Sequence, residues 1–205
     1  MRTRVKICGI TRLPDALLCL EAGVDAIGFN LWPGSKRHVP LERAVEIAAE
    51  LPEDLLKVGV FVQPDPDFVS RAVAEAGLGA VQLHGDEDPA LYAGAGVPLW
   101  QVLRIETALP LAISPHASEL LLDARVEGFG GSGQTFDWSI AREAGRFRVP
   151  FWLAGGLYPG NVGEAVRQAR PGGVDVASGV ESAPGIKNAS LVHAFVAAVR
   201  AAERG

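Results

Sequence analysis

Residues 5–11 read V-K-I-C-G-I-T, and this stretch indicates both the fold and the place of its chemistry. It predicts an apolar strand that ends on Cys8, followed at once by a glycine and the start of a helix. A cysteine at a strand end is an awkward choice for packing alone, but it suits a thiol that faces a pocket. Two later runs, W-L-A-G-G-L and D-V-A-S-G-V, end in small residues, as a backbone cradle for phosphate requires.

The same strand-and-helix pattern recurs along the 205 residues. Apolar runs predict eight strands, at 5–10, 25–31, 57–62, 80–85, 99–105, 119–124, 151–157 and 174–180. Helical patterns follow at 14–22, 41–51, 66–76, 89–95, 138–145, 159–168 and 189–202, whereas the segment 109–117 holds two prolines and is the weakest helix. Such alternation predicts an α/β protein with a parallel sheet. Without a long linker, eight units favour a single (β/α)8 TIM barrel domain over residues 1–205 rather than an open doubly wound sheet.

Composition and charge exclude several classes of protein. The formal net charge of −5 argues against a broad nucleic-acid surface. No segment has the length of a membrane span, and no signal peptide is expected, so we predict a cytoplasmic protein. The two cysteines predict no disulfide, and Cys19 fits a buried helix position. No histidine or cysteine cluster has metal-ligand spacing, so no metal is expected.

Two residues at predicted strand ends are candidates for catalysis. In a barrel the active site lies at the C-terminal ends of the strands, where Cys8 ends the first and Asp123 the sixth. The apolar neighbours Ile7 and Leu122 would face the helices, so that Cys8 and Asp123 face the barrel mouth. A thiol and a carboxyl in one pocket suit a general base and a general acid, the thiol with a lowered pKa. Taken singly, Cys8 fits a small apolar filler and Asp123 a turn cap.

Further polar residues surround these two in the predicted site. Lys6 and Asp175 lie on neighbouring strands and predict an interior ion pair, because an unpaired buried charge is costly. Arg37 in P-G-S-K-R-H is either a surface loop residue or a planar fork that grips a carboxylate. Gln82 is expected to bond a substrate hydroxyl, and His84 fits a hydrogen-bonded structural histidine better than a catalytic base.

Two glycine clusters predict a phosphate site. Gly155 and Gly156 are expected to end the seventh strand, and Ser178 and Gly179 the eighth. Loops after these two strands often form a phosphate cup, and glycine lets the backbone amides approach the anion. A further run, G-F-G-G-S-G in residues 125–137, does not match a dinucleotide fingerprint. We interpret that segment as a lid, with a flexible connector as the alternative.

Together, in order, these motifs resemble the phosphoribosylanthranilate isomerase family of tryptophan biosynthesis. The resemblance spans nearly the whole chain. It is carried by K-I-C-G-I-T, G-F-N-L-W-P-G-S-K-R, V-G-V-F-V, V-Q-L-H-G, L-L-D, G-G-S-G-Q-T-F-D-W, L-A-G-G-L-Y-P-G-N-V and D-V-A-S-G-V-E-S-A-P-G-I-K. A piece such as A-G-G-L is common to several phosphate-binding barrels, whereas the ordered set is specific. Gln134 and Ser132 depart from the family pattern, where lysine and threonine are common.

The resemblance implies a cofactor-free Amadori rearrangement of N-(5-phosphoribosyl)anthranilate to 1-(2-carboxyphenylamino)-1-deoxyribulose 5-phosphate. It implies that Asp123 protonates the ribose ring oxygen, that Cys8 removes the C2 proton, and that Arg37 holds the anthranilate carboxylate. The phosphate would rest on the two glycine clusters. The expected partner is this phosphorylated small molecule, bound by a monomer or a homodimer.

Two other functions are weighed against this one. A sugar-phosphate isomerase of histidine biosynthesis would favour an aspartate at the position of Cys8. A barrel that only binds a phosphorylated ligand would keep the glycine cradle without needing Cys8 and Asp123 together.

Overall fold

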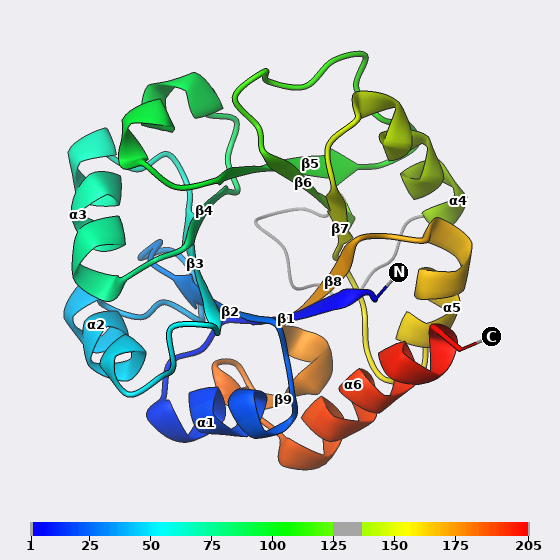
Figure 1. Ribbon diagram of the computed structural model, residues 1–205, viewed down its shortest axis with the longest axis horizontal. Coiled ribbons are helices and arrows are strands. Elements are labelled where there is room, and N and C mark those ends of the chain that lie inside the picture. The colour runs from blue at the N-terminus through cyan, green and yellow to red at the C-terminus, as the bar shows by residue number, and fades with distance from the viewer. Residues whose placement is uncertain (1, 125–136, 205) are drawn as a thin grey trace.

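The computed structural model describes residues 2–124 and 137–204. Eight parallel strands form a closed ring in chain order, with the last paired to the first. They are β1 (Arg4–Cys8), β2 (Ala26–Asn30), β3 (Leu56–Phe61), β4 (Ala80–Leu83), β5 (Leu99–Ile105), β6 (Glu119–Ala124), β7 (Phe151–Leu153) and β8 (Gly173–Val176). Helices surround this ring on its outside (Figure 1). The predicted barrel is confirmed.

Six α-helices and three short 3-10 helices lie in the described residues. The α-helices are α1 (Leu13–Glu21), α2 (Leu41–Ala49), α3 (Pro66–Ala76), α4 (Trp138–Ala141), α5 (Val162–Ala169) and α6 (Ala189–Ala202). The 3-10 helices are η1 (Pro89–Ala95), η2 (Arg142–Phe147) and η3 (Ser178–Val180).

Helix α3 shows how local sequence sets the ends of a helix. The Asp65 side chain accepts a hydrogen bond from the Asp67 amide, and Pro66 supplies a fixed φ for the first turn. Gly77 ends the helix in the left-handed region with a φ of 56°, which glycine adopts without a steric penalty. The predicted bounds of this helix are therefore confirmed.

The strands separate two apolar layers. Ile7 and Leu122 are fully buried in the layer between the strands and the helices, whereas Leu121 lies in the smaller cluster inside the barrel. Side chains alternate between the two faces of a strand, so Cys8 and Asp123 point inward as predicted.

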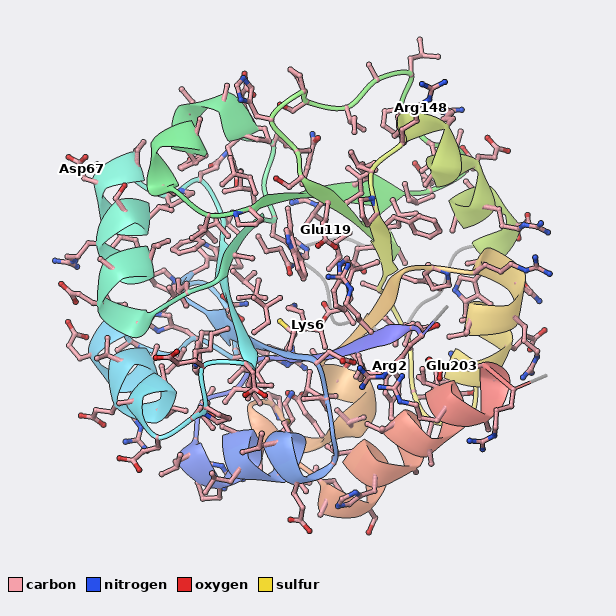
Figure 2. The ribbon with its side chains drawn as sticks, in the orientation of Figure 1. Arg2, Lys6, Asp67, Glu119, Arg148 and Glu203 are labelled. Carbon is pink, nitrogen blue, oxygen red and sulfur yellow. The ribbon has the colours of Figure 1, made fainter. Side chains whose placement is uncertain are left out.

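Aromatic side chains fill the N-terminal end of the barrel. The rings of Trp100 and Trp152 stack with centroids 4.8 Å apart, and the Arg4 guanidinium lies 4.5 Å from the Trp152 ring. Glu119 accepts hydrogen bonds from Arg4 and from the Trp152 indole. Figure 2 shows Glu119 inside the ring of strands. Because this end is packed, the open site lies at the other end.

Several segments differ from their sequence-based prediction. The segment 109–117 forms no helix. Strands β7 and β8 stop at Leu153 and Val176, so the two glycine clusters lie in the loops beyond them and not at their last residues. Helix α5 begins at Val162, because the Asn161 side chain accepts from the Tyr158 amide and donates to the Gly156 carbonyl, holding the preceding turn.

A short hairpin after β8 was not predicted. It pairs β9 (Glu181–Ala183) with β10 (Ile186–Lys187) in an antiparallel sheet of two strands. Its turn contains Gly185, with a φ of 78°. This hairpin contributes to the functional site described below.

The predicted lid lies outside the described residues except for its last residue, and so do Gln134 and Ser132. That last residue, Asp137, caps α4 by accepting a hydrogen bond from the Ser139 amide at 2.9 Å. Among the helices of the described ranges, none has both the length and the apolar character needed to cross a membrane.

We predict that Gly173→Ala destabilises the barrel, because an added Cβ would overlap the Trp152 ring. Overpacking of this kind costs about 1–3 kcal/mol of unfolding free energy, measured by denaturant titration. Gly172→Ala is the matched control, since its Cβ would find nothing closer than 3.5 Å. Equal stability of the two variants would contradict the packing of Trp152 against Gly173.

Candidate active site

A pocket opens at the C-terminal ends of the strands, above the polar interior. All of the predicted site residues except Gly179 line it; they are Cys8, Arg37, Gln82, His84, Asp123, Gly155, Gly156 and Ser178. Asn30 and Ser35 also line this pocket, although the sequence analysis did not single them out. The structure therefore brings together residues as far apart in the sequence as Cys8 and Ser178.

Cys8 lies between two glycines that give it room. A Cβ at Gly28, its partner on β2, would lie 2.9 Å from the Cys8 sulfur. Gly9 has a φ of 77°, and a Cβ there would lie 2.7 Å from the Cδ atom of Arg37. The two glycines therefore let the thiol and the arginine side chain pack closely around the end of β1.

Burial raises the pKa of the Cys8 thiol above its ordinary value. Lys6 and Lys187 act in the opposite direction through their positive charges, but they do not offset the loss of solvent. The expectation of a lowered thiol pKa is therefore wrong. At neutral pH Cys8 is a protonated thiol.

Lys6 and Asp175 form the predicted ion pair. They are directly paired positions on β1 and β8, and Lys6 Nζ lies 2.9 Å from Asp175 Oδ1. The Lys6 side chain is fully buried, and Figure 2 shows it inside the ring of strands. Burial lowers its pKa, but the Asp175 carboxylate and the neighbouring Cys8 together outweigh burial and raise the pKa overall. Lys6 is thus a cation held beneath the thiol.

A directed chain of contacts connects Lys6 to Asp123. Lys6 can only donate, so Gln82 turns Oε1 toward it at 3.0 Å and its amide nitrogen toward His84 Nδ1 at 3.3 Å. His84 then accepts at Nδ1 and carries its hydrogen on Nε2, 3.4 Å from Asp123 Oδ2. Both ends of the Gln82 amide are used within the protein, and His84 is a hydrogen-bonded residue as expected.

The glycine clusters lie against Asp123 and against backbone groups that leave no room for side chains. Gly155 has a φ of 82°, and a Cβ there would lie 2.7 Å from Asp123 Oδ1. A Cβ at Gly179 would overlap the Leu157 carbonyl oxygen. Within the described residues, no backbone carbonyl accepts a hydrogen bond from the amides of Gly155 and Gly156. These two amides can therefore donate hydrogen bonds to a bound anion, as a backbone anion site requires.

Arg37 is engaged by a residue that the sequence analysis missed. Glu181, at the start of β9, accepts hydrogen bonds from Arg37 Nε at 2.9 Å and from Nη2 at 2.7 Å. Glu181 also accepts from Lys187 Nζ at 2.8 Å. The sequence signal was the run E-S-A-P-G-I-K, in which opposite charges flank a turn-forming Pro-Gly pair. Arg37 is therefore a fixed pocket residue and not a mobile surface arginine.

Within residues 2–124 and 137–204, no group of three or more His, Cys, Asp and Glu side chains is placed to hold a metal ion. The groups that line the pocket are proton donors, proton acceptors and hydrogen-bond donors. This arrangement suits proton transfer on a small anionic molecule.

Comparison with known proteins gives the pocket a context. The family model described as N-(5'-phosphoribosyl)anthranilate (PRA) isomerase matches residues 5–198. The N-(5'-phosphoribosyl)anthranilate isomerase of Myxococcus xanthus is 48% identical, covering 98% of this chain and 97% of that protein. The isomerase of the same name from Nitrosomonas eutropha is 45% identical, covering 99% of both chains.

Solved structures agree with the sequence comparisons. The crystal structure of phosphoribosyl anthranilate isomerase from Thermus thermophilus superposes with a TM-score of 0.88 at 40% identity, covering 97% of this chain and 99% of that one. A structure of such an isomerase in complex with reduced 1-(o-carboxyphenylamino)-1-deoxyribulose 5-phosphate gives a TM-score of 0.83 at 35% identity, with the same coverage.

We predict that Lys6→Met costs about 3–5 kcal/mol of unfolding free energy, because it leaves the Asp175 carboxylate buried without its partner. The double variant Lys6→Met with Asp175→Leu should recover most of this loss, since it removes both charges. Denaturant titration of wild type, single and double variants measures the difference. A single variant as stable as wild type would show that the pair is not coupled.

Proposed function

The chain belongs to the N-(5'-phosphoribosyl)anthranilate isomerase family, and we propose that Cys8 and Asp123 are the base and the acid of its reaction. The protein is an isomerase of tryptophan biosynthesis. Its reaction is the Amadori rearrangement of N-(5'-phosphoribosyl)anthranilate, an aminoaldose, to the corresponding 1-amino-2-ketose. The observation that carries the proposal is the convergence on one pocket of a thiol, a carboxyl and two glycine amides that donate to no backbone carbonyl of residues 2–124 and 137–204.

Asp123 acts first in the proposed mechanism. Its carboxyl donates a proton to the ribose ring oxygen, the bond from C1 to that oxygen breaks, and the lone pair of the amine nitrogen forms a protonated Schiff base. Asp123 becomes a carboxylate in this step. The His84 N–H beside Oδ2 then faces the new negative charge. Gly155 supports the step because its missing Cβ leaves the carboxyl in place.

Cys8 acts second. Its thiolate removes the proton from C2, and the electron pair of that C–H bond forms the C1=C2 bond while the iminium nitrogen recovers its lone pair. The resulting enol tautomerises to the ketone. The C2 proton is acidic because it lies next to a protonated imine, so a modest base suffices. Lys6 and Lys187 favour the thiolate by their charge.

The two ends of the substrate bind at opposite sides of the reacting carbons in this proposal. The phosphate rests on the amides of Gly155, Gly156, Ser178 and Gly179, and Arg37 meets the anthranilate carboxylate. Gln82 and His84 line the pocket between the phosphate site and Arg37 in this proposal. We place the enzyme in the cytoplasm as one barrel domain, a monomer or a homodimer, without a cofactor. Its two free cysteines support the reducing compartment.

We predict that Cys8→Ala and Asp123→Asn each lower kcat by roughly a hundredfold to ten-thousandfold, the usual contribution of a general base or acid. Consumption of phosphoribosylanthranilate, generated in place and followed by fluorescence, measures the loss. Cys19→Ala is the control, since Cys19 is buried in α1 away from the pocket lining. Near wild-type turnover in either variant would remove that residue from its role.

The raised pKa of Cys8 predicts a pH dependence. A base must be deprotonated and an acid protonated to act, so the two ionisations oppose each other in the wild type. In Asp123→Asn only the base titrates, and the residual kcat/KM should rise with pH through the neutral range and above it. Adding Cys8→Asp to this variant should move the rise to lower pH, because a carboxyl ionises at about pH 4 in its ordinary state. An Asp123→Asn profile that is flat from neutral pH upward would contradict the assignment of Cys8.

A further inference from the structure

Glu181 lies between two cations at the edge of the pocket. Its side chain is 4% exposed and contacts Arg37 on one side and Lys187 on the other. Burial raises its pKa, but the hydrogen bond from Arg37 and the charge of Lys187 outweigh burial and hold the pKa below its ordinary value. Glu181 is therefore ionised at neutral pH. Two cations and one anion leave this cluster with a net positive charge, which suits an anionic ligand.

The contact with Arg37 uses one specific edge of the guanidinium group. Glu181 bonds Nε and Nη2, the two nitrogens of the lateral edge, at 2.7–3.0 Å. A guanidinium has a second edge, formed by Nη1 and the other hydrogen of Nη2, that can bind another carboxylate in the same plane. Within the described residues no hydrogen bond uses Nη1. The contact of Glu181 with the lateral edge fixes the plane of the guanidinium group. The edge formed by Nη1 and Nη2 stays available to a ligand.

Lys187 anchors Glu181 to the catalytic end of the barrel. Its side chain is fully buried, and Nζ donates to the Cys8 carbonyl at 2.6 Å and to the Ala177 carbonyl at 3.3 Å, as well as to Glu181. The hairpin turn is tied down separately, because Thr11 Oγ1 donates to the Gly185 carbonyl at 2.7 Å. Glu181 is therefore held in place by contacts to the ends of β1 and β8, and it does not lie on a free loop.

Arg37 itself has little freedom along its alkyl chain. Its Cδ atom lies where a Cβ of Gly9 would be 2.7 Å away, so the side chain passes closely over the backbone next to Cys8. Its amide also donates to Ser35 Oγ at 3.0 Å. With the alkyl chain packed and one edge bound, the direction of the remaining edge is set by Glu181.

We propose that Glu181 is a positioning residue that orients Arg37 so that its free edge recognises the carboxylate on the aromatic ring of the substrate. The inference rests on the proposed role of Arg37. It adds that selectivity for a carboxylate-bearing substrate depends on a second, protein-borne carboxylate that never touches the substrate. Loss of Glu181 frees both edges of Arg37, and the gain in positive charge does not compensate for the lost orientation.

The test compares two substrates that differ only in the recognised group. N-(5-phosphoribosyl)anthranilate carries the carboxylate, and N-(5-phosphoribosyl)aniline lacks it. The selectivity is the ratio of their kcat/KM values. We expect Glu181→Gln to lower this ratio roughly tenfold to a hundredfold, the range for loss of a charged hydrogen bond, and to bring it close to that of Arg37→Met. The kcat/KM for the aniline substrate should change little.

Two further variants separate positioning from general damage. Glu119→Gln breaks another ion pair, partly buried, in which Arg4 donates to Glu119 at the packed end of the barrel; it should leave the ratio unchanged whatever it does to stability. Glu181→Asp keeps the charge between the two cations but shortens the side chain by one methylene. It should lower the ratio as Glu181→Gln does, and it provides the test if Glu181→Gln fails to fold.

Each other outcome overturns the inference in a recognisable way. An unchanged ratio in Glu181→Gln, or a raised one, would show that orientation of Arg37 is not limiting. A ratio that falls in Glu181→Gln but not in Glu181→Asp would assign the effect to charge alone. An unchanged ratio in Arg37→Met would remove both Arg37 and Glu181 from carboxylate recognition, whereas absence of turnover of either substrate by the wild type would overturn the proposed function itself.

Discussion

The seam between β1 and β8 is the constraint on which the site depends. A closed barrel needs its first and last strands to pair, and here the register sets Lys6 opposite Asp175. Their ion pair satisfies two charges that could not be buried singly. Just beyond the last paired residues, Lys187 bridges the Cys8 and Ala177 carbonyls and extends the closure into the loops. Two buried lysines therefore hold the strand ends that carry the thiol and the loop of the proposed phosphate site.

Inside the barrel, aromatic side chains fill the N-terminal end, and the pocket opens at the C-terminal end. The stacked Trp100 and Trp152 fill the N-terminal end together with the Arg4–Glu119 pair, and a second group of polar side chains lies toward the other end. There the fully buried Lys6 dictates the orientation of Gln82, and Gln82 dictates the tautomer of His84. Such a chain has one consistent arrangement of donors and acceptors, so it fixes Asp123 more firmly than a single contact would.

The same burial that organises the site raises the pKa of Cys8, the proposed base. Removing Cys8 from water disfavours the thiolate, and the two nearby lysines recover only part of that loss. A lowered pKa was a reasonable expectation from the sequence, because the usual function of a catalytic thiol requires it. Solvent exclusion is a property of the packed molecule, however, and it is the largest influence on this group. The pKa of the thiol therefore depends on how the whole pocket packs around it, and not on the local sequence.

The sequence by itself determined the eight strands, most of the helices between them and the inward direction of Cys8 and Asp123, because these follow from local periodicity. It placed the glycine clusters after the seventh and eighth strands but extended those strands too far, since they stop at Leu153 and Val176. It also predicted the Lys6–Asp175 pair, since barrel closure makes the first and last strands neighbours. The tertiary structure alone decided the pairing of Arg37 with Glu181, which lie 144 residues apart, and the anchoring of Glu181 by Lys187. Local patterns show that a charge is present but not which distant charge it meets. That choice depends on the geometry of loops and on the cost of desolvation, and both exist only once the barrel has closed.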